Sequence, residues 1–304
     1  MFDSAIRIDM RHASPVRSAK LLVLAVALVL ASWASALADG PKRIVIAGGD
    51  LTEIAFSLGF GDRIIGVDST SNFPAETQER EQIGYVRRLT AEGILSLAPD
   101  LVVLAHDAGP DTAIDQLQAS GIKTVRGPAT DSAEGVSEKI RFVGEALGAP
   151  EAAAELAQSV EDQLADVARR VAELPDKPKV LFVLSLDRGT PLVGGIDTSA
   201  DRMIALAGAQ NAAAEIAGFK PMSQEAIIAA QPDVILMMSQ YAERLGGLDT
   251  VTARPEFALT PAGEEGRAVA IEGMLLLGFG PRTPEGIAML ARALHPETAP
   301  AAGL

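Results

Sequence analysis

The chain has 304 residues, contains no cysteine and carries a formal net charge of −14. Without cysteine it has neither disulfides nor a thiol for attaching a lipid, so a hydrophobic core must stabilise it. A chain this acidic is a poor partner for nucleic acid, whose phosphate backbone binds basic surfaces.

Residues 1–38 have the three-part pattern of a cleavable secretory signal. A net-basic start precedes the apolar run at 21–33, and the small residues Ala36 and Ala38 follow it. The run is shorter than the roughly 18 residues that cross a bilayer. We expect cleavage after Ala38 and release into the periplasm. The segment carries +2, so cleavage changes the net charge from −14 to −16.

The next elements predict a strand, glycine turn and helix at the start of an α/β domain. An apolar strand at 43–47 leads through Gly48 and Gly49 into a helix at 50–58. These glycines do not fit the dinucleotide or P-loop patterns, so a tight structural turn is the better interpretation. A second strand at 64–68 and a polar surface loop at 69–80 follow.

The central feature is a duplicated unit, which occupies residues 82–104 and recurs at 218–237. Each copy has an aromatic residue in a loop, a helix N-cap, a glutamate two residues later, and Pro-Asp before an apolar strand. Each copy therefore predicts a short helix that leads into a buried parallel strand. The shared positions are Tyr85, Thr90 and Glu92 in the first copy, and Phe219, Ser223 and Glu225 in the second.

The duplication predicts an α/β fold of two similar lobes with mostly parallel central sheets. Residues 132–174 have a helical pattern, and 151–174 as one helix would span about 36 Å, long enough to join the lobes. We therefore expect lobes at 39–150 and 175–304 with 151–174 as the connecting helix. Ligands of such folds bind between domains and at strand carboxyl ends.

The second lobe is expected to repeat the order of the first. Strands are predicted at 180–184 and 268–271, with helices at 201–207 and 285–294 and a loop at 275–284. The Pro- and Ala-rich tail after His295 is expected to be frayed.

Catalytic or metal chemistry has little support in the sequence. The histidines are His12, His106 and His295, and the first lies in the predicted signal. For His106, a hydrogen-bonded role at a strand end is favoured over catalysis or metal binding. A binding protein is therefore expected rather than an enzyme, and a periplasmic enzyme that uses the cleft stays the alternative from another class.

Residues 83–93, 218–223 and 276–284 resemble the periplasmic hemin-binding proteins of bacterial ABC importers. These belong to the class III binding proteins, whose two lobes are joined by one long helix. The resemblance implies a monomer that captures hemin (haem b) and delivers it to an inner-membrane ABC permease and its ATPase, downstream of an outer-membrane haem receptor. A cobalamin or ferric-siderophore carrier of the same class is the alternative.

The resemblance also implies how hemin is held. Tyr85 would be the axial ligand of the haem iron, because a phenolate is a hard anionic oxygen donor. Arg87 or Arg88 would stabilise that anion or pair with a propionate. Phe219, in the matching loop, cannot ligate iron, and residues 185–188 lack the histidine that some relatives use as a further ligand.

Further positions complete the expected site. Met222, Phe219 and Met274 are candidates for an apolar wall, with core packing as the alternative. Tyr241 and Arg244 follow the second repeat strand and are expected at the cleft, with a plain surface role equally open. Glu92 and Glu225 would dock onto arginines of the permease dimer, the alternative being that they only favour the helix N-termini.

Overall fold

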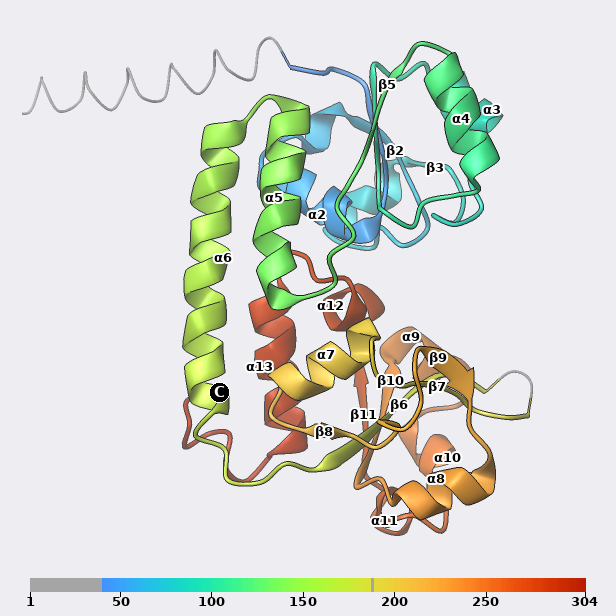
Figure 1. The fold of residues 1–304 in the computed structure, drawn as a ribbon, viewed down its shortest axis with the longest axis vertical. Helices are drawn as coiled ribbons and strands as arrows, with labels where there is room; N and C mark the ends of the chain where they lie inside the picture. Colours follow the sequence, from blue (N-terminus) through green and yellow to red (C-terminus); the bar gives the residue numbers. More distant parts are fainter. Residues whose placement is uncertain (1–39, 187–188) are drawn as a thin grey trace, which may run out of the picture. The chain divides into compact units, whose positions relative to one another are not determined.

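The computed structural model describes residues 40–186 and 189–304, so the predicted signal at 1–38 lies outside the described residues. Residues 41–304 form one compact unit with two β-sheets and surrounding helices (Figure 1). This confirms the predicted α/β class. None of the helices in the described part of the chain combines the length and apolar character that a membrane crossing requires.

The first sheet contains five parallel strands in the order β3-β2-β1-β4-β5. Its strands β1 and β4 are apolar and buried along their whole length, as expected inside a parallel sheet. The carboxyl ends of β1, β2 and β4 meet at one edge, where the loops that follow them gather. The strands are β1 (Ile44–Ala47), β2 (Ile64–Val67), β3 (Glu81–Gln82), β4 (Leu101–Leu104) and β5 (Lys123–Arg126), and the helices are α2 (Gly49–Ser57), α3 (Ala91–Ser96), α4 (Asp111–Ala119) and α5 (Ala133–Leu147).

The second sheet differs from the expected repetition of the first because it is mixed. Its order is β11-β10-β6-β7-β9, with β8 beside β6, and β7 runs antiparallel to both β6 and β9. The connection from β6 to β7 is too short for a parallel crossover, which needs a dozen or more residues. The strands are β6 (Lys179–Ser185), β7 (Leu192–Gly194), β8 (Gln210–Asn211), β9 (Phe219–Pro221), β10 (Val234–Met238) and β11 (Ala268–Ile271).

Short helices follow most strands of the second half, and one longer helix closes it. The segment expected as a loop at 275–284 begins with the end of a helix, α12. The helices are α7 (Ser199–Leu206), α8 (Gln224–Ala230), α9 (Ser239–Arg244), α10 (Leu248–Thr252), α11 (Pro261–Glu264), α12 (Gly273–Leu277) and α13 (Thr283–Leu294).

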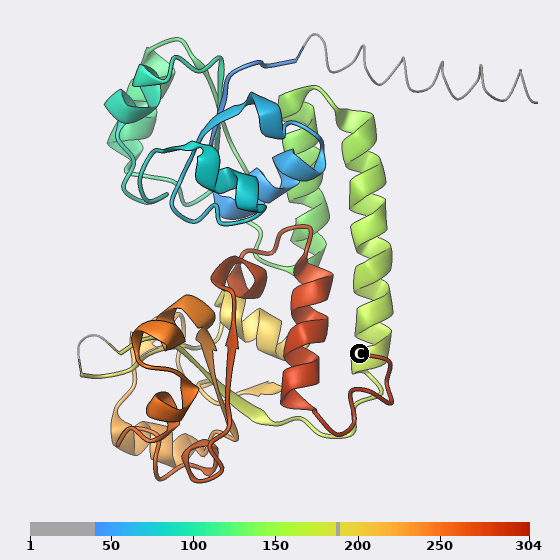
Figure 2. The same cartoon turned by 180° about the vertical axis from the view of Figure 1, so that it is seen from behind.

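The helical pattern at 132–174 forms two antiparallel helices, α5 and α6 (Pro150–Val171). Gly148 ends α5 with a φ of 79°, a left-handed conformation that glycine adopts without strain, and Pro150 starts α6. Helix α6 packs against α5 and against α13, so it runs beside both halves of the unit (Figures 1 and 2). The division into lobes at 39–150 and 175–304 stays a prediction.

The duplicated unit has the predicted cap, short helix and buried strand in both copies, but Phe219, which was expected in a loop, begins strand β9. The Thr90 hydroxyl accepts a hydrogen bond from the Gly93 amide at 3.3 Å, and the Ser223 hydroxyl accepts one from Ala226 at the same distance. These side chains satisfy free amides at the start of α3 and α8. The strands that follow, β4 and β10, are buried as predicted.

The C-terminal tail is packed rather than frayed, contrary to the expectation. Ala299 is fully buried, and the Leu304 amide donates to its carbonyl at 3.0 Å. Arg170 of α6 donates to the Gly303 carbonyl at 2.7 Å. The tail folds back because the end of α6 offers both a donor and apolar surface.

Candidate functional site

A cavity of about 590 Å³ lies between the two sheets and is lined by residues from both halves of the unit. The first half contributes the loops after β1, β2 and β4 together with the Tyr85 loop. The second half contributes Phe219, Gln240, and Met274 with its neighbours on α12. This volume lies in the range of small-molecule sites.

Backbone hydrogen bonds hold the Tyr85 loop in place on both sides. The Ser69 amide donates to the Gly84 carbonyl at 2.8 Å. The Gly109 amide donates to the Val86 carbonyl at 2.9 Å, and the Leu89 amide donates to the Gly109 carbonyl at 2.8 Å. Val86 and Leu89 are buried, so apolar packing anchors the loop. The side chain of Tyr85, which precedes them, lines the cavity.

Tyr85 and Arg87 meet at the cavity wall. Arg87 Nη1 donates to the Tyr85 hydroxyl at 2.5 Å, and its other terminal nitrogen pairs with the carboxylate of Asp107. Burial opposes the charge on Arg87, but Asp107 and Tyr85 together raise the pKa of Arg87 above its usual value. The phenol oxygen and a cation held by Asp107 therefore lie together at one point of the cavity wall.

Arg88 lies on the same loop but does not line the cavity. Its guanidinium carbon lies 5.8 Å from the centre of the Tyr85 ring, within the range of a cation–π contact. Of the two arginines, Arg87 is therefore the one that contacts both the phenol oxygen and the cavity.

Phe219 forms part of the opposite wall. Its ring packs edge-on against buried Phe182, with the ring centres 6.4 Å apart. It remains 41% exposed, an unusual value for a large apolar side chain. Phe182 thus supports the ring of Phe219, which lines the cavity.

Besides Arg88, three predicted residues do not line the cavity. Met222 and Tyr241 are buried in the hydrophobic core of the second half, and the Leu186 amide donates to the Tyr241 hydroxyl at 2.6 Å. Arg244 is exposed, and its guanidinium carbon lies 4.8 Å from the Tyr241 ring centre. Tyr241 lies in the short helix α9, which follows β10, and its side chain packs into the core and does not line the cavity.

The sequence reasoning missed polar residues that do line the cavity. They include Asp107, which with His106 follows the carboxyl end of β4, and Asp50 at the start of α2. The rule that ligands bind beyond strand carboxyl ends would have selected both loops. Among the described residues, no group of three or more His, Asp or Glu side chains is placed to hold a metal ion.

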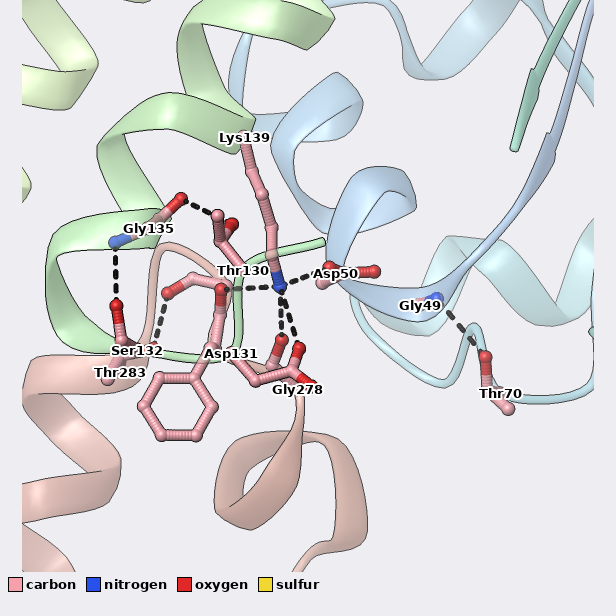
Figure 3. A network of polar contacts seen from close by, with 12 residues as sticks. Gly49, Asp50, Thr70, Thr130, Asp131, Ser132, Gly135, Lys139, Gly278 and Thr283 are labelled. Atoms are coloured by element: carbon pink, nitrogen blue, oxygen red, sulfur yellow. Dashed lines mark hydrogen bonds and ion pairs between the residues drawn. The ribbon is translucent and has the colours of Figure 1, made fainter. Parts of the chain in front are cut away.

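A buried lysine ties the two halves together beneath the cavity (Figure 3). Lys139 of α5 donates to Asp50 Oδ2 at 2.7 Å and to the Gly278 carbonyl at 3.1 Å. The Phe279 carbonyl lies 3.4 Å from the same nitrogen. Because Asp50 and Gly278 line the cavity, Lys139 fixes the point where the first half meets the α12–α13 connection.

A second ion pair crosses the same junction. Glu53 of α2 accepts from the Arg282 amide at 3.1 Å and from Arg282 Nε at 3.0 Å. Burial raises the pKa of Glu53, although the hydrogen bonds and charge of Arg282 act in the opposite direction. The Arg282 guanidinium also lies over Phe73, 3.6 Å from the ring centre.

Glu92 and Glu225 are both exposed in the first turns of α3 and α8. The backbone amide of Glu225 and the Ser223 hydroxyl lower the pKa of Glu225, so this carboxylate interacts with its own helix N-terminus. Glu225 therefore favours the N-terminus of α8, and its charge stays exposed to solvent.

Comparison with known proteins identifies the family of this chain. Residues 44–273 match the family model described as periplasmic binding protein. The solved structure of the periplasmic heme-binding protein RhuT from Roseiflexus sp. RS-1 is 42% identical with a TM-score of 0.81, over 84% of this chain and 99% of that one.

Two sequence relatives extend the match. The uncharacterized ABC transporter substrate-binding lipoprotein YvrC of Bacillus subtilis is 30% identical over 262 residues, which are 85% of this chain and 81% of YvrC. A vitamin B12-binding protein of Vibrio campbellii is 26% identical over 226 residues, 74% of this chain and 81% of that protein. Since the family model covers most of the chain, this protein belongs to the periplasmic binding protein family.

Proposed function

We propose that this protein binds hemin in the cavity between its two halves and delivers it to an inner-membrane ABC permease. One observation carries the proposal: Tyr85 lines the cavity while Arg87 donates to its hydroxyl at 2.5 Å. A phenolate held in this way is a suitable axial ligand for ferric haem. Hemin is the transported ligand, and the protein carries out no reaction on it.

The rest of the cavity supports a flat, mostly apolar ligand with charged edges. The exposed ring of Phe219 and the side chain of Met274 offer apolar surface, and Arg87 offers a cation near the first-half wall. Haem binding by the similar RhuT adds to the case. Function in the periplasm after cleavage behind Ala38 follows from the sequence pattern and is part of the proposal.

A cobalamin carrier is the second candidate, since the chain also matches vitamin B12-binding proteins. The cavity favours hemin, because a cobalamin or siderophore carrier has no need of an anionic oxygen ligand paired with an arginine. An enzyme is the least supported reading, because the relatives compared are binding proteins.

A competition titration tests the choice of ligand. The purified protein is loaded with hemin, followed by absorption, and then challenged with cobalamin or a ferric siderophore. We expect saturable hemin binding that neither competitor displaces at equal concentration. Tight cobalamin binding that expels hemin would transfer the proposal to the second candidate.

A further inference from the structure

The guanidinium of Arg87 contacts two partners at once, the hydroxyl of Tyr85 and the carboxylate of Asp107. The Arg87 side chain is 59% exposed, whereas that of Asp107 is only 28% exposed. A long, exposed arginine loses rotamer freedom when it holds a hydrogen bond to a single phenol. The second, charge-assisted bond to Asp107 offsets that loss.

The position of Asp107 is fixed by its loop rather than by chance contact. Asp107 follows β4, whose register beside β1 is continued by the Ala105 amide donating to the Ala47 carbonyl at 2.7 Å. Gly109, two residues on, exchanges both of its backbone hydrogen bonds with the Tyr85 loop, through Val86 and Leu89. The two loops are therefore joined, and the carboxylate and the guanidinium are brought together by the backbone.

We propose that Asp107 is a positioning residue for the ligating tyrosine: it holds Arg87 in the orientation that directs a hydrogen bond to the Tyr85 oxygen. This inference rests on the proposed function of hemin binding. Asp107 need not touch hemin to act, because its effect passes through Arg87. Its negative charge alone would have the opposite effect, since a bare carboxylate in the cavity repels the propionates of hemin.

Removing the Asp107 carboxylate should weaken hemin binding if Asp107 positions Arg87, and should strengthen binding if its charge acts alone, so the sign of the change tests the proposal. Hemin is titrated into Asp107→Asn, Arg87→Ala, the double variant, and Asp111→Asn as a matched control. Asp111 forms an ion pair with Arg126 at 3.1 Å in the same half but does not line the cavity. Melting temperatures verify folding, and Asp107→Glu, which keeps the carboxylate, serves as the conservative variant.

We expect Asp107→Asn to weaken hemin binding by up to about fivefold, the upper end for one partly exposed ion pair. Arg87→Ala should weaken it by about tenfold or more, and the double variant should bind hemin no more weakly than Arg87→Ala, because no arginine is left for Asp107 to position. In both single variants the phenolate-to-iron charge-transfer band should move to longer wavelength, because the phenolate oxygen loses its hydrogen bond. Asp111→Asn should leave affinity and band unchanged, and Asp107→Glu should retain most of both.

Hemin binding by Asp107→Asn that equals or exceeds wild type, with an unmoved band, overturns the inference. So do effects of the two single variants that add in the double variant. Tyr85→Phe separates the two levels of the account. If Tyr85→Phe keeps the wild-type band, the proposed iron ligation fails as a whole. If it loses the band while Asp107→Asn behaves as wild type, only the role of Asp107 fails.

Discussion

Replacing Lys139 with methionine tests whether the junction beneath the cavity holds the two halves together. Methionine keeps the apolar stem and the helix preference of the lysine, so the change removes chiefly the charge. Asp50 then loses its partner at 2.7 Å, and the Gly278 carbonyl loses its donor at 3.1 Å. Lys139 is 3% exposed and Asp50 13% exposed, so water replaces these contacts poorly.

The size of the effect follows from this burial. Removing one partner of a buried ion pair destabilises a protein by about 3 to 5 kcal/mol. Because Asp50 borders the cavity and solvent reaches part of it, we expect the lower end, about 3 kcal/mol. In a chain of this size each kcal/mol lowers the melting temperature by about 2 °C, so the expected change is about 6 °C.

Scanning calorimetry measures this change directly, and a double variant identifies its cause. If the loss comes from an orphaned carboxylate, adding Asp50→Asn to Lys139→Met should recover about 1 to 2 kcal/mol. An unchanged or higher melting temperature in Lys139→Met would refute the reasoning. So would a double variant that is less stable than the single one.

Two further predictions concern the surface and acid stability. Replacing Glu92 and Glu225 with glutamine should leave hemin affinity and melting nearly unchanged but lower carrier-stimulated ATP hydrolysis and uptake by the reconstituted importer, because charge pairs of a docking surface act mainly on orientation and encounter rate. Normal transport together with lower stability would mean that both carboxylates only favour their helices. Burial lowers the pKa of His295 below the ordinary histidine value of about 6.5, so the unfolded chain binds the proton more readily and stability should fall as the pH drops below about 6.5. Urea unfolding at about pH 7.5 and about pH 5.5 should show a larger drop for wild type than for His295→Gln, and equal drops would contradict this origin.

The fold was predictable where local chemistry and periodicity agree. The duplicated unit specified its own caps, Thr90 and Ser223, and the buried strands behind Pro-Asp, because each signal lies within a few residues. The mixed second sheet was not predictable from the repeat, since strand direction depends on the length of the β6–β7 connection. The helical pattern continues through α5 and α6 and so did not mark the turn at Gly148, although the helix expected at 151–174 begins next to the observed start of α6 at Pro150.

The site was predictable in part for the same reason. Tyr85 and Arg87 lie in the loop of the first copy of the repeat, Phe219 begins β9 in the second copy, and all three line the cavity. Tyr241 follows a repeat strand as well, but its ring lies in the core because it packs against segments that are distant in the sequence. The link from Asp107 to Arg87 also depends on tertiary contact, because the two residues belong to different loops.

The spectrum of the hemin complex tests the central claim most directly. Wild type should show a phenolate-to-iron charge-transfer band, and Tyr85→Phe should lack it and bind hemin about a hundredfold more weakly or worse, because even changes behind a metal ligand cost about 10- to 100-fold. Its melting temperature in the absence of hemin should stay close to wild type, since the change removes one hydroxyl from a partly exposed loop residue. An unchanged band and affinity in Tyr85→Phe would contradict the account.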